Sequence, residues 1–166
     1  MISCVDVAYR DAGAVAACVL FRSWTDSENA GEVVRKIGPV ADYRPGEFYL
    51  RELPCILAVL GEVREPLEAV IVDGYVWLGE EGRPGLGARL YEALGRSTAV
   101  IGVAKSRFAG ATWAVPVRRG QSARPLYVTA AGMDAEKAAQ SIGMMHGAYR
   151  IPTLLKLADR LSRCAD

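Results

Sequence analysis

The sequence of 166 residues contains one histidine and four cysteines, none of them in a CxxC pair. Zinc sites and redox motifs built from closely spaced cysteines are therefore not expected, and Cys4, Cys18, Cys55 and Cys164 are expected to be reduced thiols. The longest nearly apolar run, residues 13–21, has about half of the roughly 20 residues that a membrane-spanning helix needs. No membrane-spanning helix is expected.

Signals that would divide or export the chain are also missing. The opening residues Met-Ile-Ser-Cys-Val-Asp show no basic segment followed by an apolar one, so no secretory signal is expected and the expected location is cytoplasmic. No internal repeat, low-complexity tract or linker is visible. With 51% hydrophobic and 23% charged residues, residues 1–166 are expected to form a single globular domain, and a monomer is the expected state.

The formal net charge is only +1, which argues against binding of nucleic acid through bulk charge. The charge is unevenly distributed, however. Residues 1–80 contain 13 acidic and 7 basic side chains, a net charge of −6, whereas residues 81–166 contain 6 and 13, a net charge of +7. Two interpretations stay open: the two sets mix in three dimensions, or an acidic site is bordered by a cationic surface.

Hydrophobic periodicity and turn residues predict one α/β domain in which an antiparallel hairpin leads into a mixed sheet. The Arg-Asp-Ala-Gly sequence at residues 10–13 predicts the hairpin turn. The predicted strands are 2–9, 14–21, 32–40, 69–72, 99–104, 112–118 and 125–129. The predicted helices are 47–63, with Pro54 in its first turn or at a kink, 86–94, 134–145, with Asp134 or a neighbour as N-cap, and 153–163.

Three carboxylates stand out from this pattern. Asp6 lies between two valines in a predicted central strand, where an uncompensated charge is costly. Asp73 ends an apolar strand, the place where open α/β sheets collect ligands. Each also has a plainer interpretation, a solvated strand face for Asp6 and an Asp-Gly turn for Asp73. Glu52 lies on a predicted helix, where most glutamates are solvated.

Taken together, these residues indicate a metal-dependent site that handles phosphate. Asp6, Glu52 and Asp73 provide the hard oxygen ligands that suit Mg²⁺ or Mn²⁺. Lys105 follows another buried strand and adds a cation suited to a phosphate or a developing negative charge. The glycine-rich residues 79–87 lack the GxxxxGK[ST] spacing, so they do not indicate a phosphate-binding P-loop.

Six short motifs follow one another over residues 5–159. They are Val5-Asp6-Val7-Ala8-Tyr9, Tyr43-Arg44-Pro45-Gly46 with Arg51-Glu52, Val72-Asp73-Gly74, Ile101-Gly102-Val103-Ala104-Lys105-Ser106, Pro125-Leu126-Tyr127-Val128-Thr129, and Tyr149-Arg150-Ile151-Pro152 with Leu157-Ala158-Asp159. Their order resembles that of the endonuclease V family. The resemblance implies a ribonuclease H-like mixed β-sheet flanked by helices. It also implies Mg²⁺-dependent hydrolysis of a phosphodiester 3′ of a deaminated purine, chiefly hypoxanthine, in DNA or RNA.

The resemblance implies roles for particular residues. Asp6, Glu52 and Asp73 match the metal-binding carboxylates of the family, and Lys105 matches its essential lysine. Contacts to nucleic acid are implied by two further matches. The wedge that separates the strands beside the lesion is matched by Tyr43, Arg44, Pro45 and Gly46, with arginine in place of isoleucine. The pocket for the flipped base is matched by Gly74 and Phe108.

Two histidine-bearing stretches of the family have no counterpart in this chain. Residues 79–85 stand where a His-Pro-Arg stretch is expected, and residues 130–134 stand where Gly-His is expected. The one histidine, His146, is expected to be a partly exposed residue at a helix end. Our hypothesis is that Asp134, or Glu80 or Glu81, supplies the missing ligand or base.

The missing histidines leave a second interpretation open, a catalytically weakened relative that binds nucleic acid without cutting it. A third is an interaction protein that retains only the fold. If the protein either cuts or binds nucleic acid, its basic second half would contact backbone phosphates. The arginines expected to do so are Arg107, Arg118, Arg119, Arg124 and Arg150.

Overall fold

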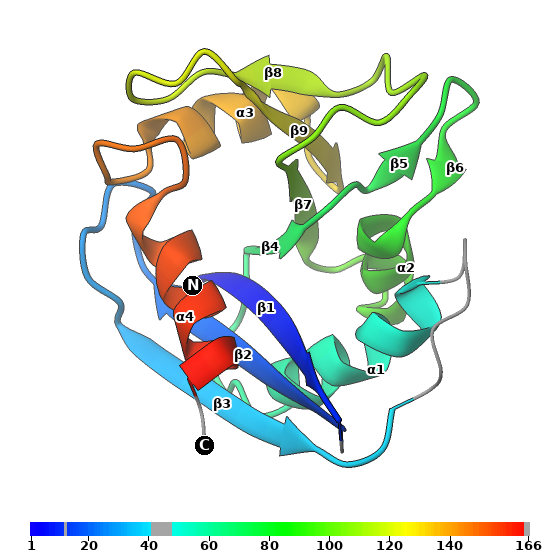
Figure 1. Ribbon diagram of the computed structural model, residues 1–166, viewed down its shortest axis with the longest axis vertical. Helices are drawn as coiled ribbons and strands as arrows, with labels where there is room; N and C mark the ends of the chain where they lie inside the picture. The colour runs from blue at the N-terminus through cyan, green and yellow to red at the C-terminus, as the bar shows by residue number, and fades with distance from the viewer. Residues whose placement is uncertain (12, 41–47, 165–166) are drawn as a thin grey trace.

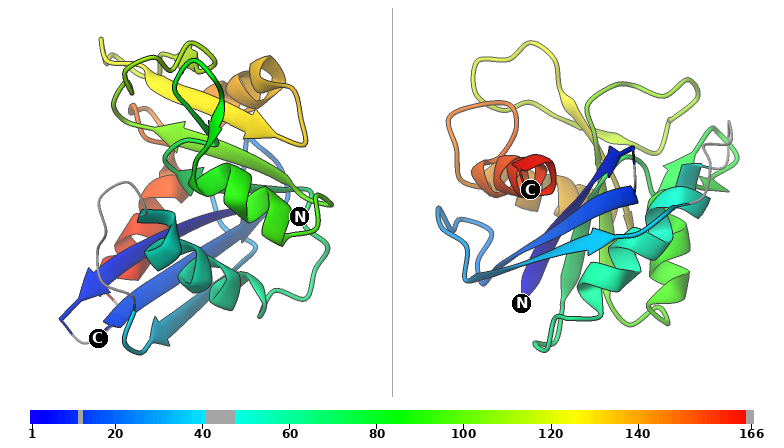
Figure 2. Two further views of the ribbon diagram at one scale, coloured as in Figure 1. Left: turned by 90° about the vertical axis from the view of Figure 1, so that its right-hand side faces the viewer. Right: turned by 60° about the horizontal axis from the view of Figure 1, so that its bottom comes forward.

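The structure, a computed structural model, describes residues 1–11, 13–40 and 48–164. It contains a seven-stranded sheet with helices on both faces (Figures 1 and 2). The strands of this sheet are β1 (Ile2–Arg10), β2 (Gly13–Phe21), β3 (Gly31–Ile37), β4 (Ala69–Asp73), β7 (Ala99–Ala104), β8 (Val115–Val117) and β9 (Leu126–Ala131). The helices are α1 (Phe48–Leu60), α2 (Leu86–Ala93), α3 (Ala135–Met144) and α4 (Thr153–Cys164).

The sheet is mixed, as the sequence predicts. Its strand order is β3-β2-β1-β4-β7-β9-β8. The central strands β1, β4 and β7 are parallel, whereas β2 and β3 extend the sheet on one side and β9 and β8 on the other by antiparallel pairing. The carboxyl ends of the three parallel strands therefore lie at the same edge of the sheet, where β1 carries Asp6, β4 ends at Asp73 and Lys105 follows β7.

Two hydrophobic cores form because successive side chains of a strand point to opposite faces. On β1, Cys4 belongs to the core that contains Leu154 and Ala158 of α4, and its thiol donates a hydrogen bond to the Leu154 carbonyl (3.3 Å). Val5 belongs to the core that contains Ile56 of α1. Helices α3 and α4 thus cover one face of the sheet, and α1 and α2 cover the other (Figure 2).

The structure corrects two predicted strands and adds a hairpin. Strand β3 ends at Ile37 rather than at residue 40, because the next residues are Gly38 and Pro39 and proline has no N–H for the ladder. The strand predicted at 112–118 is shorter in the structure, where β8 is Val115–Val117, since residues 111–114 form turns. A short hairpin of β5 (Trp77–Leu78) and β6 (Arg83–Pro84) was not predicted. In the described part of the chain, no helix has the length and apolar character to cross a membrane.

Close backbone packing beside Asp73 depends on Gly102 of β7. A Cβ atom at this position would lie 2.6 Å from the Gly74 carbonyl oxygen and 2.8 Å from the Thr129 hydroxyl oxygen. That hydroxyl accepts a hydrogen bond from the backbone N–H of Val76 (2.8 Å), with both groups buried. The absence of a side chain at residue 102 therefore lets the segment after Asp73 lie directly on the sheet.

We expect Gly102→Ala to lower the free energy of unfolding by about 1–3 kcal/mol, because the new methyl group meets backbone atoms that cannot move aside. Gly31→Ala in β3 is the matched control, since its Cβ would have only the Leu20 Cδ1 atom nearby, at 3.7 Å. The control is expected to change stability by less than about 1 kcal/mol. Urea denaturation measures both values, and equal losses in the two variants would contradict this account of Gly102.

Candidate active site

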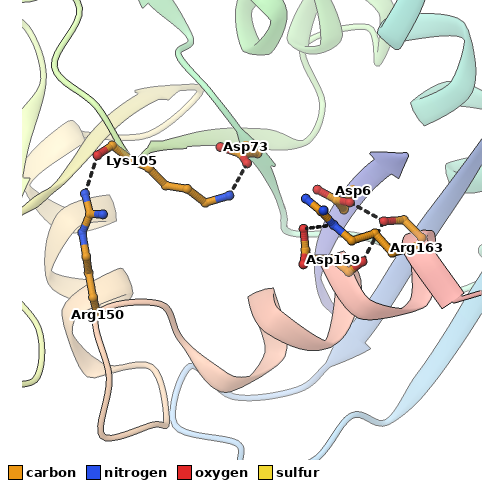
Figure 3. A network of polar contacts seen from close by, with 7 residues as sticks. Asp6, Asp73, Lys105, Arg150, Asp159 and Arg163 are labelled. Carbon is orange, nitrogen blue, oxygen red and sulfur yellow. Dashed lines mark hydrogen bonds and ion pairs between the residues drawn. The ribbon is translucent and has the colours of Figure 1, made fainter. Parts of the chain in front are cut away.

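Asp6 is half-buried in the central strand β1, on the face that α4 covers. The hydroxyl of Ser162 on α4 donates a hydrogen bond to its Oδ2 atom (Figure 3). Burial raises the pKa of Asp6, and the carboxylates of Asp159 and Asp73 raise it further, while the Ser162 hydrogen bond and Lys105 oppose the shift. The plainer interpretation of Asp6, a solvated strand face, is therefore wrong.

Glu52 lies on α1 and is buried, with only 8% of its surface exposed. Its Oε2 atom has no hydrogen-bond partner among the described residues. Burial raises the pKa of Glu52 to about 8, and the negative charges of Asp6 and Asp73 act in the same direction. A buried carboxylate without a partner is unstable unless a proton or a cation compensates it, so Glu52 is not one of the solvated helix glutamates.

The parallel pairing of β4 and β7 brings Asp73 and Lys105 close together. Asp73 is the last residue of β4 and pairs with Val103, and Lys105 comes two residues after Val103. The Lys105 Nζ atom lies 2.6 Å from the Asp73 Oδ2 atom (Figure 3). Both side chains are nearly half exposed, so this ion pair adds little to stability and stays accessible to a ligand.

Asp159 of α4 is a further member of the site. It interacts electrostatically with Asp6, and its Oδ1 atom accepts a hydrogen bond from Arg163 Nε (2.9 Å) (Figure 3). It stands in the sixth motif of the sequence, but the motif alone assigned it no role. Only the packing of α4 against β1 brings this carboxylate beside Asp6.

We call the resulting depression the carboxylate cleft. It consists of two adjoining hollows that share Asp6, Asp73, Asp159 and Arg163. Glu52 lines one hollow and Lys105 lines the other. The three sequence-predicted carboxylates and the lysine are therefore brought to one place, together with Asp159.

The cleft has the donor chemistry for a divalent cation. Within the described ranges, no group of three acidic, histidine or cysteine side chains forms a ready-made set of metal ligands. Mg²⁺ and Mn²⁺ do not require such a cage, because they bind a few carboxylates and retain several waters. The unpartnered Glu52 Oε2 atom and the accessible Asp73 carboxylate fit this kind of ion.

The hypothesis about replacements for the missing histidines is not supported by the geometry. Asp134 caps α3, where its Oδ1 atom accepts a hydrogen bond from the Lys137 N–H (3.0 Å). Asp134, Glu80 and Glu81 are absent from the residues that line the carboxylate cleft. His146 is exposed just after α3, as predicted, with its Nδ1 atom 3.0 Å from the Thr153 hydroxyl oxygen.

The structure describes both residues that the resemblance assigns to the base pocket. Gly74 adopts a positive φ of 123° directly after Asp73, and Phe108 is 39% exposed. The hydroxyl of Tyr75 accepts a hydrogen bond from the Phe108 N–H (2.9 Å) and donates one to the Ser106 carbonyl (2.7 Å), which holds this loop near Asp73. The predicted wedge, Tyr43, Arg44, Pro45 and Gly46, lies outside the described residues.

Two of the arginines expected to contact phosphates have structural partners instead. Arg119 is 6% exposed and its guanidinium donates hydrogen bonds to carbonyls of the segment before α4. The acceptors are the carbonyls of Met145, Gly147, Tyr149 and Arg150. Arg150 in turn donates to the carbonyls of Lys105 and Pro125 (Figure 3). These two side chains therefore fix the 145–152 segment, and Arg150 anchors the backbone of Lys105.

The raised pKa of Glu52 makes stability depend on pH when divalent ions are removed with EDTA. The folded chain retains this proton up to about pH 8, whereas the unfolded chain loses it near the ordinary value of 4.5. The unfolded chain therefore binds fewer protons within this window, and the free energy of unfolding falls as pH rises through it.

Glu52→Gln is expected to remove this contribution, so that the variant gains stability over the parent between about pH 5 and about pH 8. Urea denaturation at several pH values measures the difference. Glu136→Gln, at an exposed position of α3, is the control and is expected to follow the parent. A difference between Glu52→Gln and the parent that does not change with pH would contradict the raised pKa.

Comparisons with known proteins show which family the chain belongs to. The family profile of Endonuclease V matches residues 1–120. Endonuclease V of Thermococcus kodakarensis is 32% identical over 164 residues, which cover 98% of this chain and 77% of the relative. Endonuclease V of Streptomyces avermitilis is 31% identical over an alignment that covers 97% of this chain and 78% of the relative.

Solved structures show the same fold. The crystal structure of Streptomyces avermitilis Endonuclease V matches with a TM-score of 0.76 and 30% identity, over 98% of this chain and 79% of the other. The Ciona intestinalis Endonuclease V, solved with a 24mer DNA containing an inosine followed by a ribo-adenosine, matches with a TM-score of 0.78 and 22% identity, over 98% and 84%. The predicted ribonuclease H-like fold is confirmed, and the sequence and structural similarities together show that this chain belongs to the Endonuclease V family.

Proposed function

We propose that this protein is a divalent-metal-dependent endonuclease that hydrolyses a phosphodiester on the 3′ side of a deaminated purine, chiefly hypoxanthine, in DNA or RNA. The observation that carries the proposal is the buried Glu52 carboxylate, whose Oε2 atom has no hydrogen-bond partner in the described part of the chain and which lines the same cleft as Asp6, Asp73 and Asp159. A bound divalent cation would offset the negative charge of these acidic groups and so stabilise the cluster. The Ciona relative solved with inosine-containing DNA supports the choice of substrate.

Each side chain of the cleft has a task in this proposal. Asp6, Glu52, Asp73 and Asp159 would hold one or two Mg²⁺ ions, with Mn²⁺ as a substitute. When bound, such an ion supplies an activated water and stabilises the leaving oxygen. Lys105, whose ammonium lies beside Asp73, would contact the scissile phosphate and offset its negative charge. Arg150 acts indirectly, by holding the backbone of Lys105.

The base would be recognised beside the cleft, after it leaves the helical stack. Gly74 leaves open space next to Asp73, since a Cβ there would have no neighbour within 4 Å. The ring of Phe108 packs against the ring of Tyr75 at a centroid distance of 6.0 Å, which supports it as one wall of a pocket. Tyr43, Arg44, Pro45 and Gly46 would separate the strands beside the flipped base.

The first test uses DNA and RNA oligonucleotides that carry one hypoxanthine, incubated with Mg²⁺, Mn²⁺ or EDTA. The expected result is a metal-dependent nick 3′ of the lesion, reduced about 100-fold or more in Asp73→Asn, because the variant removes a charged ligand. Asp134→Asn is the control and is expected to cleave like the parent, because asparagine is an equally good N-cap. Binding without any nick by the parent would favour the weakened relative over the enzyme.

A second test concerns Asp159, which the structure adds to the site. Asp159→Asn is expected to lower kcat by about 10-fold or more, because it removes one of the acidic groups around the ion. Glu92→Gln on α2 is a matched control, since Glu92 and Arg96 form an exposed pair with the same i,i+4 spacing as Asp159 and Arg163. Equal activity of Asp159→Asn and the parent would exclude Asp159 from the metal site.

A further inference from the structure

A second depression lies next to the carboxylate cleft, and we call it the flank hollow. It lies between the first turns of α4 and the segment 27–29. Its lining includes Tyr149, Thr153, Lys156 and Arg160. Ile151 and Lys156 line both this hollow and the cleft, so a polymer that leaves the cleft across Lys156 enters the flank hollow directly.

The flank hollow combines an aromatic ring with two cations. The Tyr149 side chain belongs to a residue that is 70% exposed, which is unusual for a large aromatic residue in a folded domain. The Lys156 ammonium lies 4.3 Å from the centroid of its ring, so a cation covers one face of the ring while the residue as a whole stays largely exposed. Neither Lys156 nor Arg160 forms an ion pair with any described residue, and Glu28 is the acidic residue among those that line the hollow.

The exposed ring of Tyr149 stands on a rigid backbone. Arg119, which is buried, donates a hydrogen bond from Nη1 to the Tyr149 carbonyl (2.9 Å) and further bonds to carbonyls on either side of it. A rigid aromatic surface flanked by unpaired cations is the arrangement with which proteins hold single-stranded nucleic acid, because bases stack on the ring and phosphates attract the cations.

We propose that the flank hollow binds a single-stranded flank of the substrate strand, with a base stacked on Tyr149 and phosphates near Lys156 and Arg160. Part of this proposal rests on the proposed function, which makes the strand pass through the carboxylate cleft. The flank is single-stranded because a base inside a duplex is already stacked on its neighbours and does not offer a free face to the ring. The cations are not neutralised within the described protein, so phosphates complement them.

The test measures binding in EDTA, where cleavage does not contribute. A labelled blunt duplex with one hypoxanthine is compared with duplexes that carry a single-stranded extension of about 8 nucleotides on the 5′ or the 3′ end of the damaged strand. Fluorescence anisotropy is expected to show that one of the extensions lowers the Kd of the parent about 5-fold or more. Tyr149→Ala and Lys156→Ala/Arg160→Ala are expected to lose most of this gain, and Tyr149→Ala, which does not change the lining of the cleft, is expected to keep the Kd for the blunt duplex unchanged within about 2-fold.

Lys36→Ala/Arg64→Ala is the matched control, because it removes the same number of positive charges from positions that do not line the hollow. It is expected to retain the gain. The proposal is overturned if neither extension strengthens binding, if the hollow variants keep the full gain, or if a double-stranded extension gives the same gain.

A final arm separates this proposal from the proposed function. The binding of an undamaged single strand of about 16 nucleotides depends on the flank hollow and not on hydrolysis. Tyr149→Ala is expected to weaken this binding about 5-fold even if the parent cleaves no hypoxanthine substrate. Equal affinity of parent and variant for the single strand would overturn the flank hollow while leaving the cleavage result unaffected.

Discussion

Repulsion between carboxylates at one edge of the sheet is the constraint on which the site depends. Asp6 and Asp73 both raise the pKa of Glu52, and Asp73 and Asp159 raise that of Asp6. Among the described residues, two cations contact this group, Lys105 through Asp73 and Arg163 through Asp159. Because burial makes each charge more costly, the cluster is least stable when it is alone. A divalent cation would relieve the repulsion and place the acidic groups around the reacting phosphate, so the same feature that weakens the unliganded fold supports the proposed metal-dependent function.

The rest of the structure holds these groups in place with hydrogen bonds to the backbone. Gly102 allows the segment after Asp73 to lie against the sheet, where the Thr129 hydroxyl holds it. Arg119 is buried among carbonyl groups, and Arg150 connects the segment before α4 to the backbone of Lys105. A buried guanidinium is stabilised by several carbonyl oxygens at once, so one residue can order a whole loop. The loop in turn determines where α4 begins, and α4 carries Asp159, Ser162 and the flank hollow.

The motif resemblance to the Endonuclease V family implies an acidic centre, and this chain has acidic residues at the matching positions. The resemblance also implies histidines near that centre, and this chain has no histidine at those positions. The chain has one histidine, and it lies beside Thr153 rather than in the carboxylate cleft. Asp159 supplies an additional carboxylate from the helix that follows. The near-neutral total charge is also misleading. The acidic first half contains Asp6, Glu52 and Asp73, while the basic second half contributes Lys105, Lys156 and Arg160 around them.

By itself, the sequence determined the α/β class, the hairpin, and most strands and helices, and it singled out Asp6, Glu52, Asp73 and Lys105 as candidate site residues. These follow from local periodicity, from polar residues at the ends of apolar strands and from short motifs, all of which are readable within a few residues. Tertiary structure alone decided that Glu52 is buried with no hydrogen-bond partner for Oε2 among the described residues, that Asp134 lies outside the carboxylate cleft, that Arg119 faces carbonyls, and that Asp159 lies in the cleft. Ser162 contacts Asp6 across 156 positions of sequence. Such contacts depend on how distant elements pack together, because burial and charge are properties of the whole fold and not of the segment that carries the residue.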